Sequence, residues 1–211
     1  MDRSRLEAFS DGVFAVAITL LALNLTVEGP GHGIPLQHQL WEHRWSFAEY
    51  LLSFFIIGII WVNHHMVIKS IAVVDRTLLF LNLVLLLFVV LIPFSTATAA
   101  QYLPAGGPDV KVAMAMYSAV FLGMSVGFSS IFEWTLHGDH RTVPLPPEAH
   151  WPARLRFVGG SAIYAVAFVV SLFNAIVAFA LIAVVALYYI LEHTPSSAPA
   201  PVSPGDGAPD D

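Results

Sequence analysis

The chain has 211 residues, of which 57% are hydrophobic and 11% are charged, and its formal net charge is −6. Because a soluble domain carries about 25% charged residues, this composition indicates a membrane protein. The chain has no Cys, which excludes disulfides, thiolate metal sites and thiol catalysis, and it has no basic run of the kind that binds nucleic acid.

Five apolar stretches, of which the last is long enough for two helices, predict an all-α membrane protein with six transmembrane helices per subunit. A helix needs about 17–25 apolar residues to cross a bilayer. The expected spans cover approximately residues 6–27, 47–68, 77–100, 111–133, 156–172 and 174–192.

The last two spans come from one uncharged run of 35 residues, 157–191. A single helix of that length would be about 52 Å long, whereas the hydrocarbon core is about 30 Å thick. We therefore expect a tight turn near residues 171–174. Residues 1–193 then form one six-helix transmembrane domain, and the Pro-, Ala- and Asp-rich segment 194–211 is predicted to be disordered.

Basic residues orient the predicted spans. With the N-terminus inside, seven Lys and Arg residues lie in inner segments and only Arg44 and Lys111 lie in outer ones. This asymmetry follows the positive-inside rule and places both termini in the cytoplasm. The first span could instead be a signal peptide, but Glu7 and Asp11 interrupt its approach and no Ala-x-Ala cleavage site follows.

Charged side chains stand at the start of the first span, where the sequence reads Arg5-x-x-x-Phe9-Ser10-Asp11. Charges at the edge of a bilayer-length segment are costly unless they have partners. We therefore expect Arg5 to pair with a nearby carboxylate and Asp11 to find hydrogen-bond donors on other helices.

An aliphatic stripe follows this motif. At about 100° per residue, Val16, Leu20 and Leu23 fall on one narrow face of the helix, and Asp11 points to another side. Phe9 and Val27 continue the stripe in the two directions. From the residues alone, such a stripe is ordinary lipid-facing or packing surface.

Thr19 is the one hydroxyl close to the stripe. On sequence grounds its hydroxyl is expected to donate back to the carbonyl of Ala15, as hydroxyls in helices often do.

A polar layer is expected at the depth of Asp11. The second span runs inward and ends near this level, and the third begins there. Polar groups within a bilayer seek one another, so we expect Ser10 and Asp11 to bond to this layer. Its other members are Trp61, Asn63, His64, His65 and Asn82.

The adjacent His64 and His65 point about 100° apart on a helix and cannot easily share a metal, so no metal site is expected there. A structural hydrogen-bonding role is favoured, and a proton path through Asp11 and His64 remains open.

Two segments carry a resemblance to a known family. Arg-x-x-x-Phe-Ser-Asp running into residues 12–25, and Trp-x-Asn-His-His at residues 61–65, resemble the first two helices of the transmembrane protein 175 potassium channel family in its short prokaryotic form. The resemblance implies a homotetramer with the first helix lining a central pore. It also implies a constriction at Val16, Leu20 and Leu23, a hydroxyl ring at Thr19 and a helix-bracing role for the polar layer.

The function implied by this resemblance is a potassium-permeable cation channel of the cell inner (plasma) membrane. Its partners would be potassium ions, the lipid bilayer and further copies of the chain, with no nucleic acid and no cofactor. The sequence lacks the Thr-Val-Gly-Tyr-Gly filter motif. A ring of aliphatic side chains gates by dewetting instead.

The alternative is a small secondary transporter or proton pathway using Asp11 and His64 or His65. Transporters often contain internal repeats and broken helices, and neither is evident in this sequence. No catalytic motif indicates an enzyme.

Two further groups of polar residues lie outside the predicted spans. A short interfacial helix is expected within residues 32–45, where His32, His38 and His43 could form a weak metal site but are more readily explained as exposed loop residues. The residues after the fourth span are expected to be interfacial loop residues: Glu133, His137, Asp139 and His140.

Overall fold

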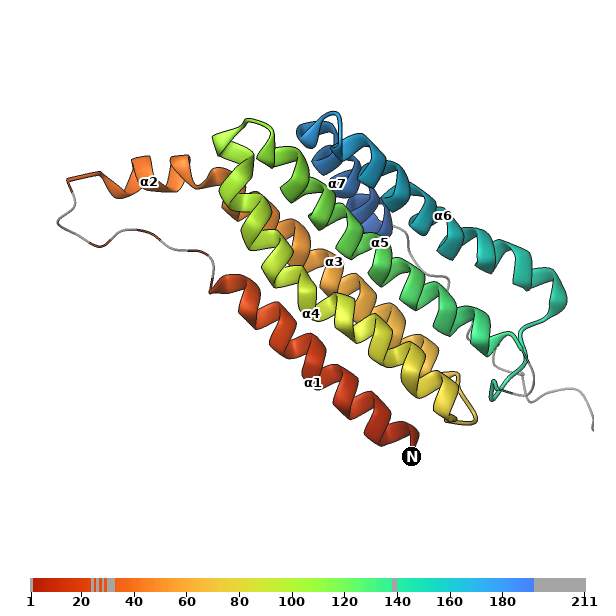
Figure 1. Ribbon diagram of the computed structural model, residues 1–211. Helices are drawn as coiled ribbons and strands as arrows, with labels where there is room; N and C mark the ends of the chain where they lie inside the picture. The colour runs from red at the N-terminus through yellow and green to blue at the C-terminus, as the bar shows by residue number, and fades with distance from the viewer. Residues whose placement is uncertain are drawn as a thin grey trace, which may run out of the picture.

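The computed structural model describes residues 2–23, 25, 27, 29, 33–137 and 140–191. Within these ranges the chain is helical and forms no extended sheet (Figure 1). The helices are α1 (Arg3–Ala22), α2 (Leu36–Glu42), α3 (Arg44–Lys69), α4 (Arg76–Ala105), α5 (Asp109–Thr135), α6 (Pro147–Ser171) and α7 (Ala175–Leu191).

The expectation of an all-α fold is confirmed. In the described part of the chain, α3, α4, α5 and α6 are long and apolar enough to cross a membrane, and α7 is a shorter apolar helix. Helix α1 is apolar over most of its length but has four charged side chains within residues 3–11. Helix α2 lies inside the segment for which the sequence predicts a short helix.

The turn between α6 and α7 shows why the long uncharged run does not form one helix. Helix α6 ends at Ser171, and the Asn174 side-chain oxygen accepts hydrogen bonds from the backbone N–H groups of Ile176 and Val177, each at 3.1 Å. Asn is a favoured residue at this position because its side chain satisfies amide groups that lack partners in the first turn.

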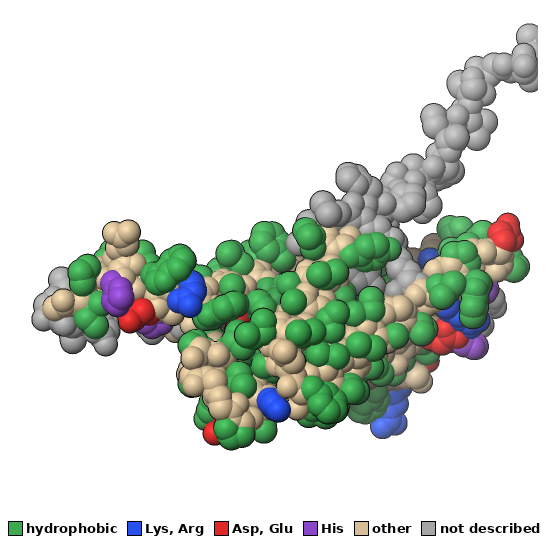
Figure 2. Space-filling model, turned by 90° about the horizontal axis from the view of Figure 1, so that it is seen from above, with side chains coloured by type: hydrophobic (Ala, Val, Ile, Leu, Met, Phe, Trp, Pro, Cys, Tyr) green, Lys and Arg blue, Asp and Glu red, His purple; other side chains and the backbone are tan. Residues whose placement is uncertain are grey.

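The long helices lie side by side in one bundle (Figure 1). Helices α4 and α5 are central, α1 lies at one edge against α3 and α4, and α6 lies at the other edge against α5 and α7. Figure 2 shows hydrophobic side chains spread over the visible face of the bundle, with most charged and His side chains toward its two ends. This distribution fits a body whose middle section meets lipid.

Small residues allow α4 and α5 to approach closely. A Cβ atom added at Gly127 would lie 3.1 Å from the Cα of Leu85, and one at Gly123 would lie 2.2 Å from the ring of Phe88. The spacing Gly123-x-x-x-Gly127 places both glycines on one face of α5, as in close helix contacts within membranes.

The loops at the N-terminal end of α1 also contact one another. The Ala72 amide donates to the His140 carbonyl at 2.8 Å, and the Thr142 amide donates to the Ser70 carbonyl at 2.9 Å. The α3–α4 and α5–α6 connections are therefore joined by backbone hydrogen bonds.

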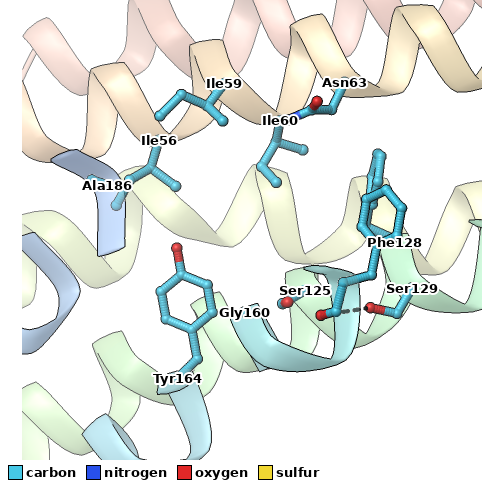
Figure 3. Close-up of a pocket in the computed structure, with 11 residues that line it drawn as sticks. Ile56, Ile59, Ile60, Asn63, Ser125, Phe128, Ser129, Gly160, Tyr164 and Ala186 are labelled. Carbon is cyan, nitrogen blue, oxygen red and sulfur yellow. Dashed lines mark hydrogen bonds between the residues drawn. The ribbon is translucent and has the colours of Figure 1, made fainter. Parts of the chain in front are cut away.

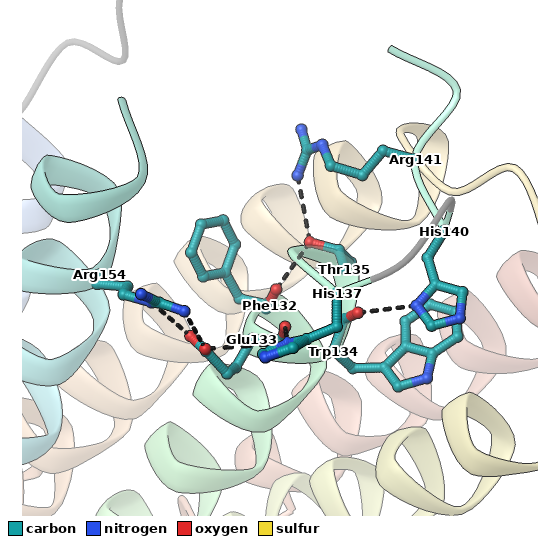
Figure 4. Close-up of polar contacts among 8 residues, drawn as sticks. All are labelled: Phe132, Glu133, Trp134, Thr135, His137, His140, Arg141 and Arg154. Atoms are coloured by element: carbon teal, nitrogen blue, oxygen red, sulfur yellow. Dashed lines mark hydrogen bonds and ion pairs between the residues drawn. The ribbon is translucent and has the colours of Figure 1, made fainter. Parts of the chain in front are cut away.

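Side-chain contacts reinforce this end of the bundle (Figure 4). Arg154 of α6 forms a two-pronged ion pair with Glu133 of α5, and one of its two contacts joins Nε to Oε2 at 2.9 Å. The His140 ring stacks on Trp134 with centroids 3.9 Å apart. Glu133 and His140 are therefore packed residues with defined partners, whereas Asp139 lies outside the described residues.

Candidate functional site: an exposed helix face and its polar support

Helix α1 buries one face and leaves another uncovered. The buried residues recur every three or four positions, which is the period of one helix face. This face packs against α3 and α4. It consists of Leu6, Ser10, Phe14, Ala17 and Leu21.

Ser10 connects the buried face of α1 to two other helices. The Ser10 hydroxyl donates to the Leu6 carbonyl at 2.9 Å and accepts a hydrogen bond from the side-chain amide nitrogen of Asn82 at 3.0 Å. The Asn82 oxygen then faces His64 Nε2 at 2.7 Å. Because that oxygen can only accept, His64 Nε2 is the donor, and a neutral His64 therefore has no proton on Nδ1.

This geometry gives three helices one buried hydrogen-bonded connection. Ser10, His64 and Asn82 are all almost fully buried. The Phe14 ring lies against the His64 ring with centroids 5.4 Å apart, so apolar packing covers the connection. Buried polar groups that are paired in this way hold helices in a defined register.

Asp11 and Glu7 contact a second part of α3. The Trp61 indole donates to Asp11 Oδ1 at 2.8 Å, and His65 Nδ1 lies 2.7 Å from Glu7 Oε1. The second contact is an ion pair when the imidazole is protonated, although its alignment is poor for a hydrogen bond. The Trp61 and His65 rings stack with centroids 6.1 Å apart.

The polar layer is thus assembled from residues of α1, α3 and α4. Six of the seven residues expected in the polar layer lie there: Ser10, Asp11, Trp61, His64, His65 and Asn82. Asp11 bonds to Trp61 and His64 bonds to Asn82, so these two contacts form separate hydrogen-bonded groups.

The expected pairing of Arg5 with a carboxylate is not present in the described part of this single chain. Arg5 is exposed, and the arginine that binds α3 is Arg3. Its guanidinium donates to the carbonyls of Lys69 at 3.1 Å and Ile71 at 3.2 Å. The last carbonyls of a helix lack partners within the helix, which makes them natural acceptors for a cation.

Asn63 also departs from expectation. It lines a pocket between α3, α5, α6 and α7 together with Ser125, Ser129 and Tyr164 (Figure 3). Successive residues on a helix point about 100° apart, so Asn63 and His64 serve different neighbours. The structure therefore places Asn63 outside the polar layer.

The uncovered face of α1 carries the aliphatic stripe. The exposed fractions are 51% for Phe9, 56% for Val16, 38% for Leu20 and 72% for Leu23. We call these four residues the exposed stripe. Val27, beyond the end of α1, is also exposed. Phe9, Val16 and Leu20 are exposed on the side of α1 away from α3 and α4, and Leu23, just after the end of α1, lies beside a hollow next to α3 and α4.

Thr19 lies beside the exposed stripe and is itself exposed. Its hydroxyl donates to the carbonyl of Val16 at 2.8 Å. The back-bond expected from the sequence is therefore formed, but to the residue three positions earlier and not to Ala15.

The His residues in and beside α2 have local partners where they are described. His38 lies 3.1 Å from Glu42 on α2, and His43 Nδ1 lies 2.8 Å from the Gln39 carbonyl. His32 lies outside the described residues.

The comparisons with known proteins bear on this arrangement of α1, α3 and α4. A family model described as "Endosomal/lysosomal potassium channel TMEM175" matches residues 5–93. A potassium channel of Streptomyces collinus is 39% identical over 198 residues, which cover 92% of this chain and 94% of the relative. The chain belongs to the TMEM175 family.

Two further matches support membership of the TMEM175 family. A potassium channel of Chamaesiphon minutus is 33% identical over 196 residues, covering 90% of this chain and 94% of the relative. The crystal structure of a lysosomal potassium-selective channel TMEM175 homolog from Chamaesiphon minutus matches with a TM-score of 0.78 and 31% identity. It covers 90% of this chain and 96% of that chain. The resemblance inferred from the sequence is therefore confirmed.

The TMEM175 family model and the candidate site coincide along the chain. The matched residues 5–93 include the whole exposed stripe and every member of the polar layer. Sequence reasoning missed Arg3 and Glu7 as contact residues. Their signal was their position on α1, since both stand within about two turns of Asp11 and face the end of α3.

Proposed function

We propose that this chain is one subunit of a homotetrameric, potassium-permeable cation channel in the cell inner (plasma) membrane. Helices α1 and α3–α7 form six spans with both termini in the cytoplasm, and α1 of each subunit lines a central pore. The observation that carries the proposal is the exposed stripe on α1, opposite a face that is held by buried polar contacts. The names of the similar bacterial proteins support it.

The exposed stripe supplies the bottleneck in this proposal. Around a fourfold axis, Val16, Leu20 and Leu23 form successive rings of aliphatic side chains. Such rings offer an ion no ligands in place of water, so they oppose passage by dewetting. Potassium is less strongly hydrated than sodium and crosses such a ring at lower cost. Modest selectivity then arises without a carbonyl filter.

The polar layer supports α1 without meeting the ion. Ser10 and Asn82 are buried between helices, and the Asp11 carboxylate bonds to α3. We expect Asp11→Ala to reduce the yield of the assembled tetramer more than it changes ion preference, because it removes the acceptor for Trp61. An intact tetramer with altered ion preference would contradict this role.

The decisive experiment measures potassium flux in liposomes that contain the purified protein. A channel gives a linear, ATP-independent flux that is larger for potassium than for sodium. Saturation of the flux, or strict coupling to protons, would indicate the transporter or proton pathway through Asp11 and His64.

Variants of the exposed stripe test where the bottleneck lies. Leu20→Ala and Leu23→Ala should each raise the flux or lower the preference for potassium, because both widen the ring. Leu187→Ala is a matched control, since Leu187 is 55% exposed on α7, which does not pack against α1. If Leu20→Ala and Leu23→Ala both behave like this control, α1 does not form the constriction.

A further inference from the structure

A carboxylic acid is buried without a partner near the end of the bundle that carries α2. Glu49, in the second turn of α3, is 0% exposed. Neither of its carboxyl oxygens has a hydrogen-bond partner among the residues that the structure describes. An ionisable group within a membrane helix is costly and usually marks a functional site.

Three buried hydroxyl groups lie one turn further along from Glu49. Ser53 Oγ is 2.8 Å from Thr96 Oγ1 of α4 and 2.9 Å from the Tyr117 hydroxyl of α5. Thr96 Oγ1 also donates to the Ile92 carbonyl at 2.8 Å. We call Ser53, Thr96 and Tyr117 the hydroxyl chain.

The direction of every proton in the hydroxyl chain follows from the last contact. Each hydroxyl has one proton. Thr96 gives its proton to the Ile92 carbonyl, so Ser53 must donate to Thr96. Tyr117 must then donate to Ser53. All three protons are used, and the Tyr117 oxygen keeps its capacity to accept.

This count decides which form of Glu49 the site accommodates. An ionised carboxylate only accepts hydrogen bonds, and no hydroxyl of the chain has a proton left to give. A neutral carboxylic acid brings one O–H donor, and Tyr117, with which Glu49 interacts electrostatically, keeps an oxygen that can accept it. Ser53, which contacts the Tyr117 hydroxyl, is one turn of α3 from Glu49, so a bridging water molecule would suffice to bring the acid proton to that oxygen.

None of the ionisable groups on the neighbouring described helices provides Glu49 with a charged partner. Tyr117 of α5 interacts electrostatically both with Glu49 and with Tyr164 of α6. Helix α4 brings no Asp, Glu, Lys, Arg or His after Arg76, and α7 brings only tyrosines. On α3 itself, Arg44 donates to the Trp41 carbonyl of the α2 segment at 2.9 Å.

A hollow lies one helical turn from this site. A space of about 480 Å³ lies between the end of α1, the start of α3 and the end of α4. Its lining includes Ser46, which is one turn of α3 from Glu49, and Ala100, which is one turn of α4 from Thr96. Leu23 of the exposed stripe also lines it.

We propose that Glu49 is a proton-binding site, in which a proton from water in this hollow converts the carboxylate to the neutral acid that completes the hydroxyl chain. Loss of the proton leaves the carboxylate without donors unless Tyr117 turns its hydroxyl away from Ser53. That movement breaks the hydrogen bond between Ser53 of α3 and Tyr117 of α5. The site is independent of whether the protein conducts potassium.

Infrared spectroscopy of the full-length protein in liposomes tests the proposal. At neutral pH the wild type should show the C=O stretch of a protonated carboxyl group, and Glu49→Gln should abolish that band. Glu148→Gln should leave it unchanged, because Glu148 is an exposed carboxylate at the start of α6, at the opposite end of the bundle. A wild-type spectrum without a band that Glu49→Gln removes would overturn the assignment.

Two more variants guard against a misfolded Glu49→Gln. Glu49→Asp keeps the acid and should shift the band without abolishing it. Tyr117→Phe removes the acceptor and should shift the band as well. An unchanged band in Tyr117→Phe would show that Glu49 does not act through the hydroxyl chain. In potassium flux, should the channel be active, the dependence on outside pH should be weaker in Glu49→Gln than in the wild type.

Discussion

The two faces of α1 differ in almost every physical respect, although they share one short helix. The buried face combines apolar residues with Ser10. It packs on α3 and α4, and its buried polar group is hydrogen-bonded. The exposed stripe is aliphatic and aromatic, and the rest of the described chain leaves it open. The comparison shows that the motif residues and the residues proposed to meet the ion are separated by helical phase. The proposed roles of the two faces, support and conduction, can therefore be tested separately.

The largest effect is expected from a matched pair of phenylalanines. Phe14 is 1% exposed and belongs to the buried face of α1, whereas Phe9 is 51% exposed and belongs to the exposed stripe. Phe14→Ala should lower the free energy of unfolding by about 3–5 kcal/mol because it leaves a cavity against His64. Phe9→Ala should lower it far less. Thermal unfolding of the detergent-solubilised variants measures both, and equal losses would show that both faces are packed.

A smaller effect on the free energy of unfolding is expected from substituting the side-chain amides of Asn82 and Asn63. Asn82→Ala leaves the Nε2 proton of His64 buried without an acceptor, which costs about 1–3 kcal/mol. Asn63→Ala is the control, since Asn63 is only partly buried and lies outside the polar layer. The same thermal measurement applies. If the Asn63 variant is the less stable of the two, the support of α1 does not depend on the Ser10–Asn82–His64 connection.

The smallest effect on stability is expected at Thr19. Thr19→Val should change the free energy of unfolding by less than about 0.5 kcal/mol, because the side chain is exposed and nearly isosteric. Thr98→Val is the matched control, since Thr98 is a partly exposed threonine that donates to the Phe94 carbonyl of α4. A change in potassium flux that appears only in Thr19→Val would place this hydroxyl on the ion pathway. Identical flux in both variants would remove it from that pathway.

Sequence periodicity predicts which residues share a face of one helix, and this is why the exposed stripe and the opposite position of Asp11 could be anticipated. The contacts between helices depend also on how each helix is rotated, which a single sequence does not specify. His64 and Asn63 are neighbours in sequence, yet only His64 faces α1. Arg3 rather than Arg5 reaches α3 for the same reason.

Glu49 illustrates a second limit of sequence reasoning. Its position near the start of a predicted span is compatible with an ordinary interfacial carboxylate. Only the packing of α4 and α5 around it shows that the side chain is enclosed and that nearby hydroxyl protons are already donated. Counting the hydrogen-bond donors requires knowing which residues contact Ser53. Those residues, Thr96 and Tyr117, are more than 40 positions away in the sequence.

The hydrogen bond from Thr19 to the Val16 carbonyl affects whether this side chain can interact with a cation or with an anion. Because the hydroxyl proton is held by the Val16 carbonyl, the side chain turns only oxygen lone pairs and a methyl group toward the open side of α1. A ring of four such side chains would present electron density without a competing proton. It would attract a cation that has shed part of its water and would offer nothing to chloride. The two roles considered for Thr19 are therefore compatible, since the back-bond itself orients the oxygen as an acceptor.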